Sequence, residues 1–347
     1  MSPADTPAGA FDHDVVIVGG GPAGCSAGVF TAREGLDTVI YDCGRSSLKR
    51  CAHLENYLGF PAGIDIETMY DLIQDHAETA GCTFVSDLVQ SLAPTDGGFE
   101  VHLQGGASVT ARRVVAATRY DGEYMRGLDD DEVLFESYEH EGETRESFDG
   151  GYANQDGTTP IDGLYIATPA EKEDTQAILA AGRGARVGRR VVGDVHIDEG
   201  WWPERADSVD WVRREAELDG EWTDRQRWIE WFDDSYADEA PVPTDSERYR
   251  RVRAAYVDEL LDSHISPAEM ESRAEEGHRK LAAHLDAEVI AECLDAEIIA
   301  DTLDAGTVVE SLGSDVLLDA LDDGAILDAV SDEQIHSYAQ SMEEKTP

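Results

Sequence analysis

A glycine-rich turn between two short apolar runs constrains the fold of this chain more than any other feature. Residues 14–42 read DVVIVGGGPAGCSAGVFTAREGLDTVIYD, and Val15–Val18 is a β-branched run typical of a buried parallel strand. After the glycines, Ala23–Glu34 favours a helix and Thr38–Tyr41 predicts a second strand, which Asp42 closes. Strand, glycines, helix, strand and acid in this order predict a dinucleotide-binding unit.

Each residue of the turn has a chemical reason to be there. Gly19 permits a tight turn, Gly21 lets the backbone approach a pyrophosphate, and Gly24 lets the helix pack closely on the strand. Pro22 suits the first helical position, and the free N–H groups of that helical turn attract phosphates. Asp42 is placed to accept hydrogen bonds from ribose hydroxyls. The alternative is a glycine-rich turn of some other α/β protein, which the complete context disfavours.

The charge of the chain is extreme. Its 347 residues, enough for one large or two modest domains, carry a net charge of −47. An acid excess with so few lysines resembles proteins of salt-accumulating haloarchaea, in which acidity serves solvation. An acidic surface for a basic partner is the alternative, but the excess is spread over the whole chain. We expect a halophilic protein with no nucleic acid and no membrane as partner, because both would be repelled.

The sequence also predicts where the protein resides. The start MSPADTPAGAFDHD has no signal-peptide character, and no apolar run is long enough to span a membrane. The cysteines show neither a CxxC motif nor metal-ligand spacing. They are Cys25, Cys43, Cys51, Cys82 and Cys293. We therefore expect a cytoplasmic, reduced protein without a disulfide framework or a metal site.

Beyond Asp42 the chain resembles low-molecular-weight thioredoxin reductases and related pyridine nucleotide–disulfide oxidoreductases. The stretches that carry the resemblance are Leu54–Val89, Arg112–Thr118, Thr159–Thr168 and Asp174–Arg190. The resemblance covers roughly 12–122 and 158–193. It implies an α/β fold class, with a single, discontinuous, three-layer Rossmann-like FAD-binding domain followed by an all-α C-terminal region.

The resemblance implies FAD as the cofactor and gives cofactor-contacting positions. These positions are Gly19, Gly21, Pro22, Ala23, Gly24, Asp42, Asn56, Val89, Thr118, Thr175, Gln176 and Ala177. Asn56 would lie near the flavin or ribityl chain, and Val89 would present its backbone to the adenine. Thr118 would pass beside the cofactor. The helix start at 175–177 would face the flavin ring, where its dipole stabilises negative charge on the reduced flavin. For Val89 and Thr118, ordinary strand packing is an equal alternative.

The chain departs from this family in three places. The family inserts a complete NAD(P)H domain between the two FAD halves, whereas here the connector 123–157 is too short for one and predicts short strands or an acidic loop. Arg119 replaces the glycine of an Ala-Thr-Gly motif, and Thr168-Pro169 replaces a Gly-Asp pair that holds the ribityl and phosphate groups. Arg119 offers a phosphate donor in return. We expect NADPH not to bind at the family's usual place.

The catalytic residues are unknown from sequence, with Cys51 and His53 as weak candidates. Lys49 and Arg50 would favour the Cys51 thiolate, and Cys43 offers a second thiol. The simpler interpretation, which we prefer, makes Cys51 a packing residue in a cofactor-contacting loop and His53 a surface residue.

The C-terminal third differs in character. All six tryptophans fall in 194–243, a predicted helical cap whose aromatic residues pack on the FAD domain or, alternatively, form a lid or docking surface. Residues 244–347 predict an acidic helical module with nine-residue repeats over 285–338. That module is an interaction or oligomerisation element or, alternatively, a poorly ordered halophilic tail.

Together these features predict a flavoprotein oxidoreductase. Its donor would be something other than NADPH bound in its own domain: ferredoxin, a protein dithiol or a small molecule. A protein redox partner and a homo-oligomer are expected partners. The alternative is a non-catalytic nucleotide-binding or interaction protein derived from this family.

Overall fold

A computed structural model describes residues 11–44, 46–119, 121–140, 143–168, 176–207, 210–214 and 218–293. The chain divides into two compact units, residues 1–284 and 285–347. In the second unit the structure describes a short helix, α8 (Ala287–Cys293), within the first of the nine-residue repeats. The remaining repeats lie outside the described residues.

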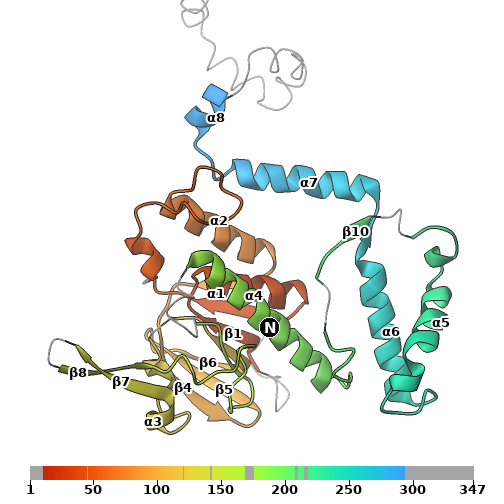
Figure 1. Cartoon of the computed structure of the whole chain (residues 1–347), viewed down its shortest axis with the longest axis horizontal. Helices are drawn as coiled ribbons and strands as arrows, with labels where there is room; N and C mark the ends of the chain where they lie inside the picture. The colour runs from red at the N-terminus through yellow and green to blue at the C-terminus, as the bar shows by residue number, and fades with distance from the viewer. Residues whose placement is uncertain are drawn as a thin grey trace, which may run out of the picture. The chain divides into compact units, whose positions relative to one another are not determined.

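A seven-stranded sheet forms the centre of the first unit (Figure 1). Its strands are β1 (His13–Val18), β2 (Thr38–Tyr41), β3 (Thr83–Val85), β4 (Val89–Thr95), β5 (Gly98–Leu103), β6 (Ser108–Ala116) and β9 (Leu164–Ile166). The order is β3-β2-β1-β6-β5-β4, and β9 pairs with the carboxyl-terminal end of β6. β5 is antiparallel to both of its neighbours, β4 and β6, whereas β1, β2, β3, β6 and β9 are parallel. The late strand β9 thus returns to the sheet that the first half of the chain builds.

Alternate residues of the parallel strands face two different layers. Val15 and Ile17 pack against the helices α1 (Pro22–Arg33), α2 (Ile66–Thr79) and α4 (Ala177–Asp198). Val16 and Val18 face the opposite layer, which β4, β5, η2 (Glu123–Met125) and α3 (Asp131–Leu134) supply. This is the α/β fold class that the sequence predicts, with a parallel-rich sheet between two layers.

Close packing of α1 on α4 fixes the helical layer. A Cβ added at Gly184 would lie 2.0 Å from the carbonyl oxygen of Ala23, and one at Gly188 would lie 2.8 Å from that of Ala27. The two helices therefore approach at a distance that only glycine allows.

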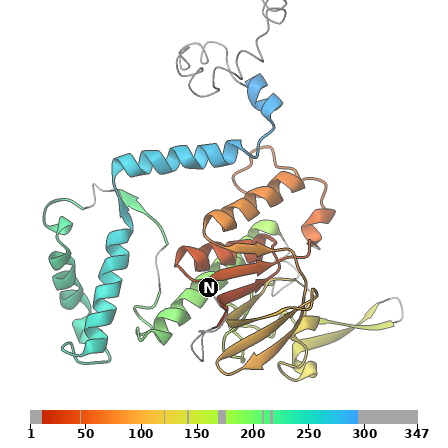
Figure 2. The ribbon, with the colours of Figure 1, turned by 180° about the vertical axis from the view of Figure 1, so that it is seen from behind.

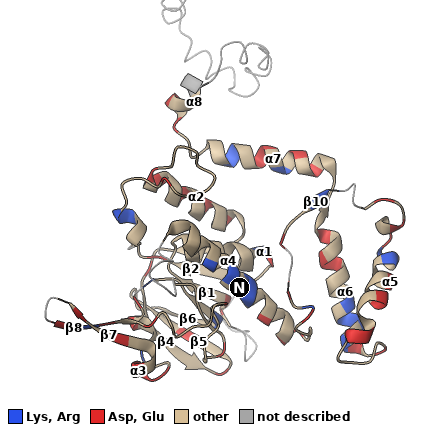
Figure 3. Cartoon of the chain, viewed as in Figure 1, with Lys and Arg blue, Asp and Glu red and all other residues tan. Residues whose placement is uncertain are grey.

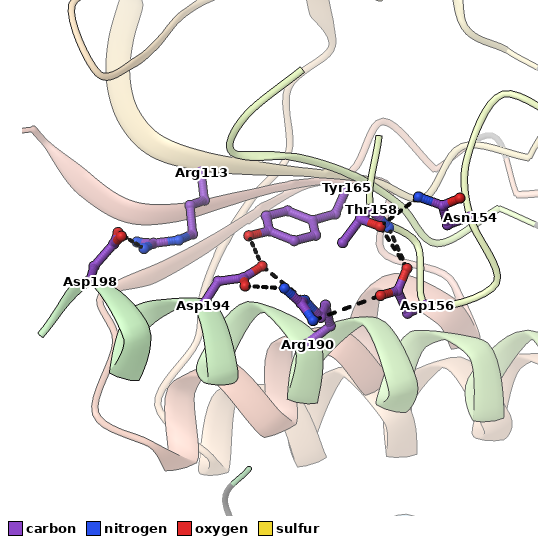
Figure 4. A network of polar contacts seen from close by, with 8 residues as sticks. All are labelled: Arg113, Asn154, Asp156, Thr158, Tyr165, Arg190, Asp194 and Asp198. Atoms are coloured by element: carbon purple, nitrogen blue, oxygen red, sulfur yellow. Dashed lines mark hydrogen bonds and ion pairs between the residues drawn. The ribbon is translucent and has the colours of Figure 1, made fainter. Parts of the chain in front are cut away.

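A network of ion pairs and hydrogen bonds fastens β9 to α4 (Figure 4). The Tyr165 hydroxyl donates to Asp194 at 2.7 Å, and the Arg190 guanidinium donates to the same carboxylate. The buried Arg113 side chain of β6 reaches Asp198 of α4 at 2.6 Å. These contacts hold the carboxyl-terminal half of α4 against β9 and β6.

The connector between β6 and β9 is small. Beyond η2 and α3, its described residues form an antiparallel hairpin, β7 (Phe135–His140) and β8 (Glu143–Phe148), which projects from the sheet (Figure 1 and Figure 2). Phe135 and Phe148 anchor it with an edge-to-face contact at 6.5 Å. The short strands expected here are present.

The helical cap has a hydrophobic core of its own. Its elements are η5 (Gly220–Thr223), α5 (Arg225–Tyr236), η6 (Ala237–Glu239), α6 (Glu247–Asp262) and the paired strands β10 (Arg213–Arg214) and β11 (His264–Ile265). The next helix, α7 (Pro267–Ala282), contributes no residue to this core. Trp202 stacks on Tyr249 at 6.0 Å, and Phe232 packs edge-on against both rings. The sequence predicts that the tryptophans pack on the FAD domain. Trp201 stacks on His196 of α4 at 4.3 Å, whereas the other buried rings mainly pack on one another, because α5 and α6 together close an aromatic core. Helices α6 and α7 belong to this first unit rather than to the repeat module.

Acidic residues lie on the surface of both the sheet domain and the cap, as Figure 3 shows on α2, β7, α5 and α7. None of the helices in the described ranges is long and apolar enough to cross a membrane.

Candidate cofactor site

A cavity of about 470 Å³ opens at the carboxyl ends of β1 and β2, where ligands bind in doubly wound sheets. It is lined by Gly19, Gly21, Asp42, Val89 and Thr118, all expected from sequence. These residues come from four different elements or their ends, and the fold brings them to one edge of the sheet.

Glycine is needed for a different reason at each of Gly19, Gly21 and Gly24. Gly19 has a φ of +107°, and a Cβ there would lie 2.8 Å from the Ala117 carbonyl oxygen. A Cβ at Gly24 would lie 1.8 Å from the carbonyl oxygen of Gly19, so it serves helix–strand packing and does not line the cavity. At Gly21 the nearest atom would be Ser46 Oγ at 3.6 Å, which leaves the backbone open to a ligand. Helix α1 begins directly after it at Pro22.

Asp42 is brought close to the turn by a second tight approach. A Cβ at Gly20 would lie 2.9 Å from the Cβ of Asp42. Oδ1 of Asp42 accepts a hydrogen bond from the Gly44 N–H at 3.2 Å. Asp42 also lines the cavity. Asp42 is thereby placed to accept ribose hydroxyl groups.

A second cavity, of about 130 Å³, shares Gly21, Ser46, Ser47, Ala117 and Arg119 with the first and therefore adjoins it. Its remaining walls come from the start of α1, the loop after η1 (Ser47–Arg50), the end of β9 and the start of α4. They are Pro22, Ala23, Leu48, Cys51, Thr168, Ala177 and Ala180.

One polar group on the wall of this second cavity lacks a partner, whereas Asn56 and Gln176, both expected as cofactor contacts, line neither cavity. Thr168 is buried, and its Oγ1 has no hydrogen-bond partner among the residues that the structure describes. The Asn56 amide donates to Gln176 Oε1 at 2.8 Å, which ties the cofactor loop to the residue that precedes α4. Thr175 lies outside the described residues. A buried hydroxyl that lacks a partner beside a cavity fits a ligand with polar groups, such as a ribityl chain.

Arg119 connects the two cavities. It has a φ of +67° and is the one non-glycine residue with a positive φ in the described part of the chain. Its Nη1 donates to Ser47 Oγ at 2.7 Å, and the side chain borders both cavities. The position thus keeps the backbone conformation that glycine favours but adds a guanidinium, a good phosphate donor. The neighbouring Thr118 hydroxyl lies 3.0 Å from Tyr124 OH.

The four cysteines whose side chains the structure describes fall into two classes. Cys25 and Cys82 are buried, and burial raises the pKa of both thiols, that of Cys82 to about 12. Cys43 and Cys51 are exposed and line the first and the second cavity, respectively. The preferred prediction that Cys51 is a buried packing residue is therefore wrong, because its loop leaves the thiol open to solvent. His53 does not line either cavity; its Nε2 lies 3.3 Å from the Ala62 carbonyl oxygen.

Sequence reasoning missed part of the wall. The missed residues are Ser46, Ser47, Asp87, Asp121 and Tyr124. Ser46 precedes η1 and accepts from the Leu48 N–H at 3.4 Å, which is a capping arrangement that the sequence pattern Ser-Ser-x-Lys does not signal strongly. Ser47 lies in η1 itself, and the other three residues reach the cavity from the turn before β4 and from the segment after β6.

Comparison with known proteins points to the same segment. The family model described as an FAD binding domain matches residues 14–50. NADPH-dependent thioredoxin reductase 3 of Arabidopsis thaliana is 31% identical over 99 residues, covering 27% of this chain and 19% of that protein. Thioredoxin reductase of Rickettsia felis is 26% identical over 113 residues, covering 32% of this chain and 36% of that protein. The chain thus matches well under half the length of either relative.

Among solved structures, a thioredoxin reductase from Gloeobacter violaceus superposes with a TM-score of 0.45 at 18% identity, covering 58% of this chain and 98% of that one. FAD is the cofactor that the family match identifies, and the matched residues include the glycine turn and Asp42. The two adjoining cavities and the glycine cradle fit such an extended dinucleotide.

Proposed function

We propose that this chain is an FAD-dependent oxidoreductase of thioredoxin-reductase-like type that receives electrons from a donor outside its own fold. Bound FAD would supply the electron-accepting group. In this proposal Gly19, Gly21 and the first turn of α1 hold the pyrophosphate, and Asp42 holds the adenosine ribose. Val89, which lines the same cavity, would border the adenine.

The second cavity would take the ribityl end of the cofactor. Thr168 offers its hydroxyl there, and the Asn56–Gln176 pair fixes the loop beside the start of α4. The N-terminus of α4, at Ala177, would stabilise negative charge on the reduced flavin. Arg119, fixed by Ser47, would neutralise a phosphate between the two halves.

We infer an external electron donor from the β7–β8 hairpin. The family resemblance expects a nucleotide-binding domain between β6 and β9, and the described residues there form a hairpin with a short helix. A hairpin of two six-residue strands offers no βαβ unit for a second dinucleotide. Ferredoxin, a protein dithiol or an oxidisable small molecule remain as donor classes, and Cys51 at the second cavity is the candidate thiol for exchange with a dithiol.

Reduction of the reconstituted protein tests this proposal. After FAD is bound, the flavin band is followed anaerobically with NADPH, with reduced ferredoxin and with dithiothreitol. We expect no bleaching by NADPH and bleaching by one of the other two. Fast stoichiometric bleaching by NADPH would contradict the external donor, and a Cys51→Ser variant with unchanged dithiol kinetics would remove that thiol from the reaction.

A second candidate function is nucleotide binding without catalysis. The flavin-side cavity is much smaller than the nucleotide-side cavity, about 130 against 470 Å³, and this asymmetry favours a site that binds the adenosine half more completely. In that case ADP would compete with FAD at nearly equal affinity, and no donor class would reduce the flavin. The acidic surface, in this proposal, serves a high-salt cytoplasm, and a homo-oligomer or a redox partner would use the C-terminal module.

A further inference from the structure

We propose that Glu34, His196 and Glu259 bind a divalent first-row metal ion, with zinc as the best-fitting ion. The three side chains offer one imidazole nitrogen and two carboxylate oxygens that all lie within 4.8 Å of one another. Glu34 follows α1, His196 lies in the last turn of α4, and Glu259 lies on α6. The site would therefore join the FAD domain to the helical cap.

The distances fit a shared ion better than direct hydrogen bonds. His196 Nε2 lies 3.4 Å from Glu34 Oε1 and 3.6 Å from Glu259 Oε1. Direct N–H···O bonds are usually about 2.7–3.2 Å long. Two ligands of a tetrahedral zinc ion, each about 2.0–2.2 Å from the metal, are separated by about 3.4 Å. The observed separations need only small side-chain rotations to meet that geometry.

The imidazole is oriented as a metal-binding histidine usually is. His196 Nδ1 lies 2.9 Å from the Ala206 carbonyl oxygen, to which it can only donate. Nε2 points at the two carboxylates, and in the neutral imidazole with its proton on Nδ1 it carries the lone pair that a metal ion needs. The ring is stacked on Trp201 at 4.3 Å, and its side chain is 5% exposed, so its direction is fixed by packing.

The two carboxylates leave the site accessible. Their side chains are 22% and 36% exposed, so solvent water can reach the site and a metal ion has an entry path. Two carboxylates and a neutral imidazole carry a charge of −2, which a divalent cation neutralises. Imidazole nitrogen with carboxylate oxygen favours zinc over magnesium or calcium, which prefer oxygen ligands alone.

The consequence would be a metal crosslink between two separately built cores. Around this point the cap already contacts the FAD domain through Arg33, which donates to both oxygens of Asp210 at 2.8 and 2.9 Å. An ion bound by three elements would add a constraint between α1, α4 and α6. Ligands at positions 34, 196 and 259 share no short motif, which is why the sequence predicted no metal site.

Zinc binding by the full-length protein tests the proposal. The protein and its variants carry Cys43→Ser and Cys51→Ser, so that the exposed thiols cannot bind zinc. Each is stripped with chelator, dialysed against zinc in the presence of excess Mg²⁺ to saturate nonspecific carboxylates, and then measured for bound metal and for melting temperature with and without zinc. His196→Asn keeps an amide donor for Ala206 but lacks Nε2, and Glu259→Gln removes one carboxylate. His284→Asn is the matched control, because His284 pairs with a single carboxylate, Asp75.

We expect the parent and the His284→Asn variant to retain equimolar zinc and to melt at least about 4 °C higher with it. His196→Asn and Glu259→Gln should lose both the bound zinc and the shift. Since the shift is measured within each protein, a variant that is less stable without metal still gives a decisive result. Equimolar zinc in His196→Asn, or no retained zinc in the parent, would overturn the proposal.

Discussion

The cofactor cradle and the helical cap are both well packed, but different parts of the sequence determine them. In the cradle, close approaches within one segment, residues 19–42, define the structure: Gly24 lies against Gly19, and Gly20 against Asp42. In the cap, large rings far apart in sequence close the core, as with Trp202, Phe232 and Tyr249. The difference shows that a binding site can be encoded locally while the element beside it depends on long-range side-chain packing.

We expect the largest effect from Gly24→Val, which disrupts the packing of the cofactor cradle. Because a Cβ there would lie 1.8 Å from a carbonyl oxygen, α1 must move away from β1. We expect FAD affinity to fall by at least about 100-fold, or about 2.7 kcal/mol, while the cap keeps its near-UV circular dichroism.

Gly182→Ala is the matched control for that change. It lies in α4 with no atom within 4 Å of an added Cβ, and we expect a gain of about 0.5–1 kcal/mol in unfolding free energy with unchanged FAD binding. Normal FAD affinity in Gly24→Val, measured by fluorescence titration, would show that the close approach does not shape the site.

We expect the next largest effect from Phe232→Ala, which removes a buried ring from the core of the helical cap. Phe232 is fully buried between Trp202 and Tyr249, so its loss should cost about 3–5 kcal/mol. Limited proteolysis should then cleave within α5–α6 while the FAD affinity stays within about twofold. A parallel loss of FAD binding would show that cap and cradle form one cooperative unit. Trp211→Ala, at a residue 61% exposed, serves as control.

Asp42→Ala removes one charged contact from the cradle without disturbing its packing. A hydrogen bond to a charged acceptor contributes about 1.5–3 kcal/mol, so FAD affinity should fall about 10–100-fold at unchanged melting temperature. Asp96→Ala, on the exposed β4–β5 turn, should bind FAD normally. An Asp42→Ala protein with parental affinity would remove the ribose contact from the proposal.

We expect Arg119→Gly to raise the free energy of unfolding and to lower the affinity for FAD. Relief of a left-handed conformation stabilises the fold by about 1–2 kcal/mol, whereas loss of the guanidinium should weaken FAD binding about 10-fold. Arg119→Lys should recover only part of the affinity, because it lacks the planar fork. Tighter FAD binding by the glycine variant would mean that Arg119 obstructs the cofactor.

The smallest effect is a pattern of thiol reactivity. Alkylation requires the thiolate, and the raised pKa of Cys82, about 12, keeps that thiol neutral at about pH 8; burial has the same effect on Cys25. Peptide mapping should find Cys43 and Cys51 labelled and Cys25 and Cys82 unlabelled, with FAD slowing the reaction of the first two. Labelling of Cys25 in the folded protein would contradict the packing of α1 on the sheet.

The features that the sequence could predict are the locally determined ones, and the features that it could not predict depend on long-range packing. The strand at Thr38–Tyr41 has the predicted bounds, and α1 starts one residue before its expected start, because glycine and proline positions act on their own neighbours. The hydrogen bond between Ser47 and Arg119 could not be predicted from the sequence, since it depends on the left-handed backbone conformation of Arg119 after β6. The mutual packing of the cap rings, and the meeting of Glu34, His196 and Glu259, arise only when α1, α4 and α6 come together.

The central claim is that the chain binds FAD in the cradle between β1, β2 and α4. The most direct measurement is the visible absorption spectrum of the full-length protein, reconstituted with FAD in concentrated salt and freed of unbound flavin. We predict a flavin band that corresponds to equimolar FAD and is lost in Gly24→Val. A colourless protein that does not retain added FAD would contradict the account.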